Sequence, residues 1–313
     1  MNYIVLHTVS GSAYAKRVAR SLQWIKTHRK GNSIERVVTL PVTKISAVGN
    51  DFSPDNTTIY ARAAHPDTPW MDKLVVMEKM GFRVVNSTST LRLTADKLAC
   101  SLHLQGKVEH PRTWKYSKSF TLKQIGNIRD DIDATINHPD YIIAKPVTSM
   151  EQGANVKKIY LNFWPDLIRE EIDKIPGDEV ILQEFVPYSA LHRVIVIGGK
   201  ALPYTFMDKP EWHEEGDWKV SCCLNRTTMK LNEYPREDLL DMAEKVQSCV
   251  GGEINFIDIF EVPMIDDATY FTVSEINTAC NLRIHENLAR AAGRADWNIH
   301  YRIASYLSKK ETT

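Results

Sequence analysis

Two short strand-like stretches near the end of the sequence decide its interpretation. Residues 254–260 read Ile-Asn-Phe-Ile-Asp-Ile-Phe, and residues 270–277 read Tyr-Phe-Thr-Val-Ser-Glu-Ile-Asn. Because so few residues separate them, they favour an antiparallel hairpin. A turn at Asp266-Asp267 would pair the two strands so that Asp258 lies opposite Glu275.

Glu275 has a second oxygen-bearing neighbour on its own strand. Asn277 follows it by two residues, so both side chains project from the same face. Together with Asp258 they would form a patch of two carboxylates and one amide in an apolar setting. Such a patch suits Mg²⁺, with phosphate and water as its remaining ligands. The same pattern also fits an ordinary hairpin whose acids face solvent, and the hairpin alone does not separate these interpretations.

The composition indicates a globular protein with two or three lobes. The chain has 313 residues, of which 43% are hydrophobic, and it carries 39 basic and 39 acidic residues. This balance is unlike that of a nucleic-acid-coating protein, so no extended nucleic-acid-binding surface is expected. No apolar run approaches the roughly 20 residues of a membrane span, so no membrane partner is expected.

The first residues and the cysteines indicate a cytoplasmic protein. Residues 1–7 form a short apolar run without a basic segment, and they are expected to form a first strand rather than a signal peptide. The five cysteines include no CxxC motif, and the adjacent pair Cys222 and Cys223 makes a poor disulfide framework. Reduced thiols are therefore expected.

Strand-like and helix-like segments alternate, which predicts a mixed α/β fold in three lobes, residues 1–88, 89–180 and 181–313. Thr94 is expected to cap a short helix that ends at Gly106. Gly198-Gly199 predicts a tight hairpin turn.

Several other segments could bind a nucleotide. Lys145 ends a strand and precedes the loop 147–155, which contains Gly153, so the lysine could reach phosphates that the loop cradles. A solvated surface lysine is the alternative. Lys97 lies near a helix start, where the preceding acid could simply favour the first turn.

A hinge and two arginines complete the candidate residues. Residues 183–186 could pair their backbone with an adenine edge, or they could form a core strand. Arg193 and Arg226 could neutralise phosphate oxygens through bidentate contacts, or they could be surface ion-pair residues. The hinge consists of Gln183, Glu184, Phe185 and Val186.

The order of these segments, from about residue 58 to 284, resembles the ATP-grasp superfamily and its RimK-like branch of amino-acid and peptide ligases. Each motif is weak alone, but six occur in the family's order and spacing. They are Val85-Asn86-Ser87 with Asp96-Lys97, His110-Pro111-Arg112-Thr113, Ala144-Lys145-Pro146, Gln183-Glu184-Phe185-Val186, Arg193 to Gly199, and Asp258 with Glu275-Ile276-Asn277.

This resemblance implies an N-terminal pre-ATP-grasp α/β domain followed by two lobes that enclose ATP. It implies ATP binding by Lys97, Lys145, Gly153 and the hinge, and Mg²⁺, with Mn²⁺ as an alternative, at Asp258, Glu275 and Asn277. Arg193, Asn225 and Arg226 are the implied catalytic residues.

The implied activity is an ATP-dependent ligation of a carboxylate to an amine through an acyl phosphate. The implied partners are an amino-acid or peptide substrate and an amine co-substrate, and a homo-oligomer is compatible with the pattern. The sequence departs from the family where Leu191-His192 replace a ribose-binding acid and where the phosphate loop holds one glycine. These departures support the rival interpretation, a non-catalytic ATP-binding sensor or scaffold, whereas the complete set of Asp258, Glu275 and Asn277 argues against it.

Overall fold

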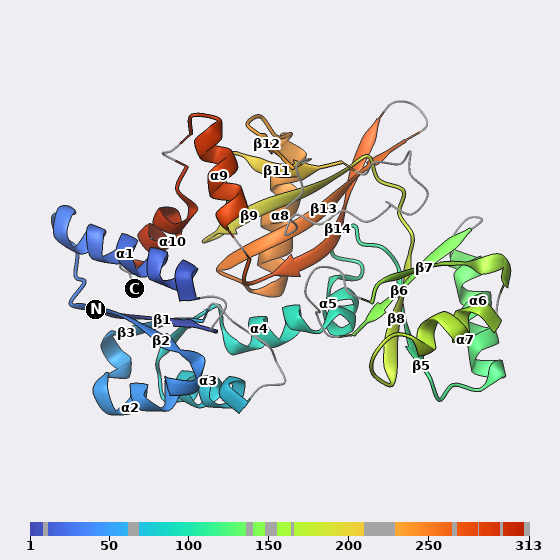
Figure 1. Cartoon of the computed structure of the whole chain (residues 1–313), viewed down its shortest axis with the longest axis horizontal. Coiled ribbons are helices and arrows are strands. Elements are labelled where there is room, and N and C mark those ends of the chain that lie inside the picture. The colour runs from blue at the N-terminus through green and yellow to red at the C-terminus, as the bar shows by residue number, and fades with distance from the viewer. Residues whose placement is uncertain are drawn as a thin grey trace.

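The fold was analysed in a computed structural model, which contains three sheets (Figure 1). The structure describes residues 1–8, 12–61, 69–135, 140–147, 155–163, 166–209, 229–264, 268–280, 282–294 and 297–309. The expected mixed α/β architecture is confirmed. In the described ranges, no helix is both long and apolar enough to cross a membrane.

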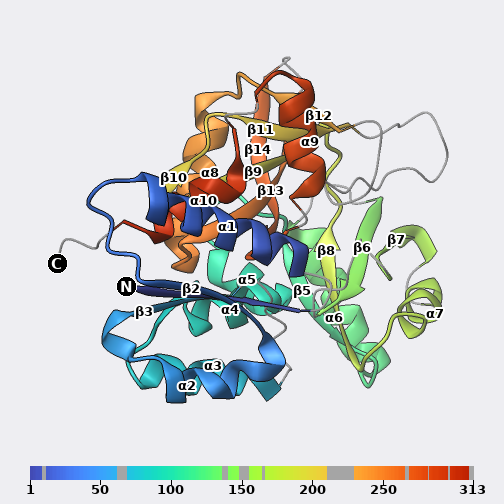
Figure 2. The same cartoon turned by 60° about the vertical axis from the view of Figure 1, so that its left-hand side comes forward.

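The N-terminal domain is built on a parallel sheet in the order β2-β1-β3-β4. β1 is buried along most of its length because helices cover both faces of the sheet, α1 on one side and α2 and α3 on the other (Figure 2). Its elements are β1 (Asn2–His7), α1 (Ser12–His28), β2 (Arg36–Pro41), α2 (Val48–Asp51), β3 (Thr57–Ala61), α3 (Pro69–Lys79) and β4 (Arg83–Val85).

Two short helices follow this domain, α4 (Thr88–Ala95) and α5 (Lys97–Leu104). The expected helix cap at Thr94 is wrong, because Thr94 lies inside α4 and donates its hydroxyl to the Thr90 carbonyl at 2.9 Å. Asp96 caps α5 instead, accepting a hydrogen bond from the Ala99 amide at 2.9 Å. A carboxylate is a strong N-cap acceptor, and this cap places Lys97 at the first position of α5.

The central lobe is an antiparallel sheet in the order β5-β8-β6-β7. Helices α6 and α7 pack on it and enclose a separate apolar core that includes Ile125, Ile142 and Ile172. Its elements are β5 (Thr113–Ser117), α6 (Leu122–Thr135), β6 (Tyr141–Pro146), β7 (Lys157–Tyr160), α7 (Asp166–Asp173) and β8 (Glu179–Glu184).

The final lobe is an antiparallel sheet in the order β12-β11-β9-β13-β14, with β10 beside β9. Helices α5 and α8 cover one face, and α9 and α10 pack at one end of the other. The turn Gly198-Gly199 has φ angles of +61° and +80°, as a primed hairpin turn requires. The elements are β9 (Ala190–Ile197), β10 (Lys200–Ala201), β11 (Thr205–Asp208), β12 (Lys230–Asn232), α8 (Glu237–Val250), β13 (Ile254–Pro263), β14 (Thr269–Asn277), α9 (Arg283–Ala291) and α10 (Ile299–Leu307).

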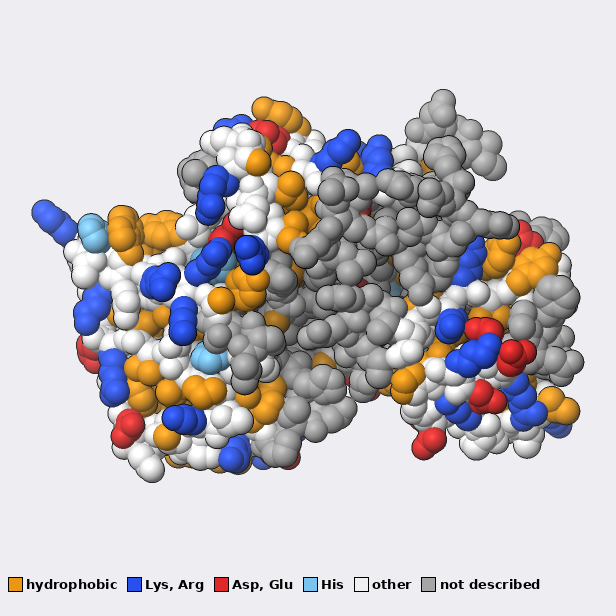
Figure 3. Space-filling view, in the orientation of Figure 1, with side chains coloured by type: hydrophobic (Ala, Val, Ile, Leu, Met, Phe, Trp, Pro, Cys, Tyr) orange, Lys and Arg blue, Asp and Glu red, His pale blue; other side chains and the backbone are white. Residues whose placement is uncertain are grey.

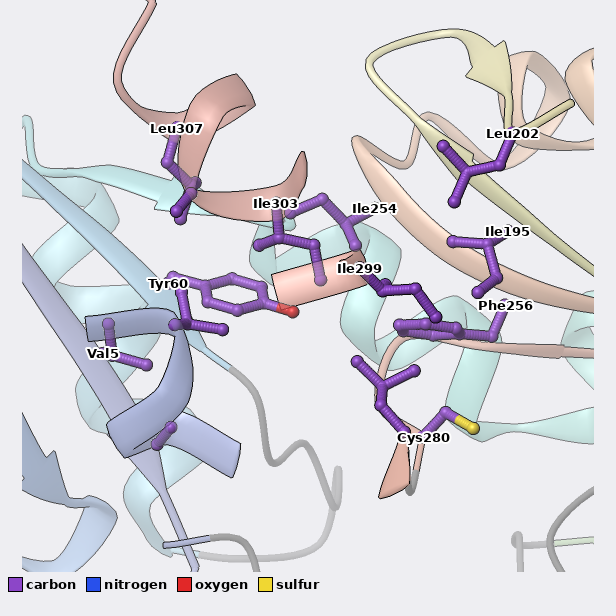
Figure 4. Packing of buried hydrophobic residues seen from close by; sticks show 14 of the residues in the cluster. Val5, Tyr60, Ile195, Leu202, Ile254, Phe256, Cys280, Ile299, Ile303 and Leu307 are labelled. Atoms are coloured by element: carbon purple, nitrogen blue, oxygen red, sulfur yellow. The ribbon is translucent and has the colours of Figure 1, made fainter. Parts of the chain in front are cut away.

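The N-terminal domain and the final lobe share one hydrophobic core. Val5 and Tyr60 of the N-terminal sheet belong to the same buried cluster as Ile303 of α10 and Phe256 of β13 (Figure 4). All four side chains are nearly inaccessible to solvent. Residues far apart in the chain therefore form a single packed unit.

The side chain of Asn86 stabilises this junction through hydrogen bonds to backbone groups at the start of β13. It is fully buried, and its Oδ1 accepts from the amides of Glu253 at 2.7 Å and Ile254 at 2.8 Å. Its Nδ2 donates to the carbonyl of Ile254 at 2.8 Å. One side chain thus satisfies three backbone groups at the start of β13.

We expect Asn86→Ala to lower the free energy of unfolding by about 2–4 kcal/mol, since buried backbone groups would lose their partners. The measurement is a thermal melt without ligand, with the exposed Asn162→Ala as the matched control. Equal melting temperatures for the two variants would show that Asn86 does not hold the junction.

Candidate functional site

The hairpin β13–β14 places Asp258 directly opposite Glu275, as the sequence predicted. A bulge follows at once, because Ile259 pairs with Val273 and Ser274 is left as an extra residue. From there toward the turn, each pair differs by one residue from the predicted register. The predicted turn residues Asp266-Asp267 lie outside the described residues.

Arg193 extends this pair into a row across three strands. It is the partner of Asp258 in the β9–β13 ladder, so Arg193, Asp258 and Glu275 lie side by side. The Arg193 guanidinium donates to both carboxylate oxygens of Asp258, from Nε to Oδ1 at 2.7 Å and from Nη2 to Oδ2 at 2.5 Å. Burial raises the pKa of Asp258, and Arg193 opposes that rise.

Lys97 approaches the row from α5. Its Nζ lies 3.4 Å from Oε1 of Glu275. Although burial acts to raise the pKa of Glu275, the neighbouring Lys97, Lys145 and Arg193 hold it below its ordinary value. The Lys97 amide also donates to the carbonyl of Val147 at 3.0 Å, which connects the start of α5 to the residue that follows β6.

Lys145 reaches the same place from the central lobe. It lies in β6, and its Nζ donates to Oε1 of Gln183 at 2.7 Å. Gln183 in turn donates to Thr113 Oγ1 at 3.0 Å, so the amide is fixed from both ends. Burial, and then the charge of Lys97, lower the pKa of Lys145 to about 7.

One small cavity joins these groups. Its volume is about 20 Å³, room for about one water molecule. Lys97, Lys145 and Glu275 line it, together with Thr94, Cys100, Ser101, Leu104, His110, Val273, Ser274 and Ile276. The structure therefore brings together two lysines, Lys97 and Lys145, and a carboxylate from a distant part of the chain, Glu275.

The metal set expected from sequence consists of Asp258, Glu275 and Asn277, the last residue of β14. Asn277 lies two residues beyond Glu275 and opposite Phe256. Within the described ranges, no group of three His, Cys, Asp or Glu side chains is arranged to hold a metal ion. The expected set differs from such a group because its third member is an amide.

The expected hinge lies at the seam between the central and final lobes. Glu184 ends β8 and its amide donates to the Arg112 carbonyl at 2.9 Å, while Val186 is buried. The Phe185 ring packs against the central lobe, with Lys158 Nζ 3.9 Å from its centroid and Tyr141 edge-on at 5.9 Å. This face of Phe185 is therefore already occupied.

Three of the expected site residues, Gly153, Asn225 and Arg226, lie outside the described residues. Most of the expected phosphate loop, residues 148–154, does so as well.

Two side chains, those of His110 and Asp208, were given no role in the site from the sequence. His110 lines the cavity and lies 3.1 Å from Ser101 Oγ, and burial followed by Lys145 lowers its pKa to about 4, so the ring is neutral near pH 7. Asp208 ends β11, fully buried, and no described residue donates a hydrogen bond to either carboxylate oxygen. From the sequence, His110 is only the start of the family-like segment 110–113, without a role in the site. An acid that ends a strand carries no sequence signal of burial, so Asp208 could not be identified.

Solved structures with the same architecture identify the fold. The ATP-grasp ligase PsnB, complexed with precursor peptide PsnA2 and AMPPNP, is 15% identical and superposes with a TM-score of 0.61 over 97% of this chain and 95% of its own. A RimK domain ATP-grasp protein from Sphaerobacter thermophilus is 17% identical, with a TM-score of 0.62 and coverage of 98% and 99%. The D-cycloserine synthetase DcsG is 12% identical, with a TM-score of 0.68 and the same coverage.

No protein-family model matches the chain, and no curated protein matches its sequence. The structural likeness nevertheless covers nearly the whole of this chain and nearly the whole of each neighbour. The chain has the ATP-grasp fold, which confirms the prediction made from the order of its motifs.

Proposed function

We propose that this protein is an ATP-dependent ligase that joins a carboxylate to an amine and forms ADP. The observation that supports this best is the cavity in which Lys97 and Lys145 meet Glu275, beside the Asp258–Arg193 pair. Its structural neighbours include ligases of peptides and small molecules, and PsnB has been solved with Mg and ADP. A RimK-like kinship is part of the proposal.

Mg²⁺ fits the donors present, with Mn²⁺ as an alternative. Each carboxylate oxygen has two lone pairs, so Asp258 retains acceptor capacity beside the Arg193 fork. Asp258 and Glu275 would hold the ion with Asn277, and phosphate oxygens and water would complete its shell. When bound, the ion would offset the negative charge of the phosphates.

The chain's own residues would mainly position the substrates and neutralise charge. Lys97 and Lys145 would bind phosphate oxygens while a substrate carboxylate attacks the γ-phosphorus and ADP leaves. The amine would then attack the acyl carbon, and phosphate and a proton would be released. From the family resemblance, Arg226 and Asn225 are proposed to face the transferred phosphoryl group, and Gly153 to cradle it.

Nucleotide entry would require the cavity to open. A space of about 20 Å³ cannot hold a triphosphate. Lys145 belongs to the central lobe and Glu275 to the final lobe, so a separation of these lobes about the segment after Glu184 would widen the cavity between them. Closure afterwards would keep water from the acyl phosphate.

The activity is tested by ADP release in the presence of Mg²⁺, screened over amino acids singly, in pairs and with short peptides. Hydroxylamine separates the two half-reactions, since it converts an acyl phosphate to a hydroxamate without the natural amine. Hydroxamate formation with one carboxylate would support ligation and identify the acid. ATP binding without carboxylate-dependent ADP release across the screen would contradict it.

A second candidate, a non-catalytic ATP sensor or scaffold, has one specific observation in its favour. Arg193 occupies both oxygens of Asp258, as it would in a purely structural ion pair. In that case ATP should bind equally well with and without Mg²⁺, and the Arg193–Asp258 pair should persist in the bound state. Strong Mg²⁺ dependence of ATP affinity would instead support the ligase.

The lowered pKa of Lys145 predicts proton uptake on nucleotide binding. Near pH 7 about half of the free protein carries a neutral Lys145, and phosphate contact favours the ammonium form. Uptake of about 0.5 proton per ATP is therefore expected at pH 7 and little at pH 6, with affinity falling as pH rises above 7.

Calorimetry in buffers of different ionisation enthalpy measures this uptake, and the difference between wild type and Lys145→Met assigns it. Equal uptake in both proteins would show that Lys145 does not titrate on binding.

A further inference from the structure

A recess separate from the candidate active site lies where the N-terminal domain meets the final lobe. Its volume is about 240 Å³. It shares no lining residue with the cavity around Lys145. α1 lines one side of it, and α9 and the start of α10 line the other. Its charged and polar lining consists of Arg17, Arg20, Ser21, Glu286, Arg290 and His300, with Asn298 at the α10 cap.

Glu286 is the one acid among the described residues that line this recess, and its carboxylate already has two partners. Its side chain is 9% exposed, and its carboxylate receives Arg17 Nη1 at 2.5 Å and contacts His300 Nδ1. Burial acts against ionisation, yet His300 and Arg17 hold the pKa of Glu286 below its ordinary value. Glu286 therefore offsets about one positive charge and fixes Arg17 in place.

Two guanidiniums remain in excess. Arg20 and Arg290 are exposed, and no acid in the described ranges forms a salt bridge with either. Among the described lining residues, three arginines and one carboxylate give a net charge of +2 before any protonation of His300. Figure 3 shows basic side chains gathered on this face around α1 and α9.

We propose that this recess binds a small dianion through the guanidiniums of Arg17, Arg20 and Arg290. Guanidinium groups match the planar, bidentate geometry of phosphate and carboxylate oxygens, and the cap of α10 adds a partial positive charge. The recess has room for a phosphate or a short dicarboxylate. Because the ligand would contact both α1 and α9, its binding would stabilise the folded protein.

The test is a titration of the full chain with inorganic phosphate or succinate at constant ionic strength, followed by thermal shift and calorimetry. All proteins carry Lys145→Met, so that phosphate binding at the nucleotide site is weakened throughout. The test variant adds Arg20→Gln and Arg290→Gln. The control adds Lys16→Gln and Arg302→Gln, which remove the same charge from exposed positions on α1 and α10.

The expected result is saturable binding that weakens at least about tenfold in the test variant and stays unchanged in the control. Tighter phosphate than succinate would identify a phosphoryl ligand, and the reverse order a dicarboxylate; either supports the site. Equal weakening in the two variants would reduce the effect to general charge and overturn the proposal. Absence of any saturable binding beyond matched chloride would overturn it as well.

Discussion

Glu275→Gln is expected to lower Mg²⁺-dependent ADP formation at least about 100-fold while the protein stays folded. The substitution keeps the size of the side chain but removes the charge that faces Lys97 and the proposed ion. About one third of the Glu275 side chain is exposed, at 34%, so an amide there can be hydrated. The measurement is a coupled ADP-release assay over a Mg²⁺ titration, with a thermal melt of each variant.

The exposed Glu237→Gln on α8 is the matched control and should retain full activity. Full activity of Glu275→Gln at all Mg²⁺ concentrations would remove Glu275 from the proposed metal site.

Asp258→Asn should also abolish activity, but its effect on stability differs. Asp258 is the charge partner of the buried Arg193, so its loss leaves a guanidinium unpaired and should cost about 3–5 kcal/mol of stability. The double variant Arg193→Met/Asp258→Asn should recover much of the melting temperature without recovering activity. A double variant that melts no higher than Asp258→Asn would indicate that the two residues do not act as a pair.

Lys145→Met should weaken ATP binding by about 10–100-fold, because charge-assisted contacts to phosphate contribute roughly 1.5–3 kcal/mol. Methionine fills a similar volume but leaves Gln183 Oε1 without its Lys145 donor, so a modest loss of stability is expected, and a thermal melt checks that the variant is folded. The measurement is calorimetry with Mg²⁺ and ATP.

The exposed Lys309→Met serves as control for the loss of one positive charge. Equal ATP affinity in the Lys145 and Lys309 variants would place the phosphates elsewhere.

Local sequence predicted the Asp258–Glu275 pair because a hairpin leaves few choices of register. It missed the bulge at Ser274, since an extra residue in one strand leaves the alternation of apolar positions almost intact. It also placed a helix cap at Thr94, although two nearby polar residues could have capped. In the structure Asp96 caps α5, and Thr94 lies inside α4.

The partner of Arg193 could not be predicted in the same way. Arg193 and Asp258 are 65 positions apart in the chain, and their pairing depends on how the whole sheet is ordered. The recess around Glu286 is a still more distant case, because Arg17 belongs to the first helix of the chain. Such contacts are set by tertiary packing, of which a single sequence carries no periodic trace.

The separate core of the central lobe has a consequence for hydrogen exchange. Because α6, α7 and their sheet enclose apolar residues of their own, this lobe can open locally while the shared core around Tyr60 and Phe256 stays intact. Amides of β6 should then exchange faster than those of β1 or β13. A nucleotide held between Lys145 and Glu275 would slow β6 selectively, so exchange there would report occupancy without turnover and before the acid or the amine is known.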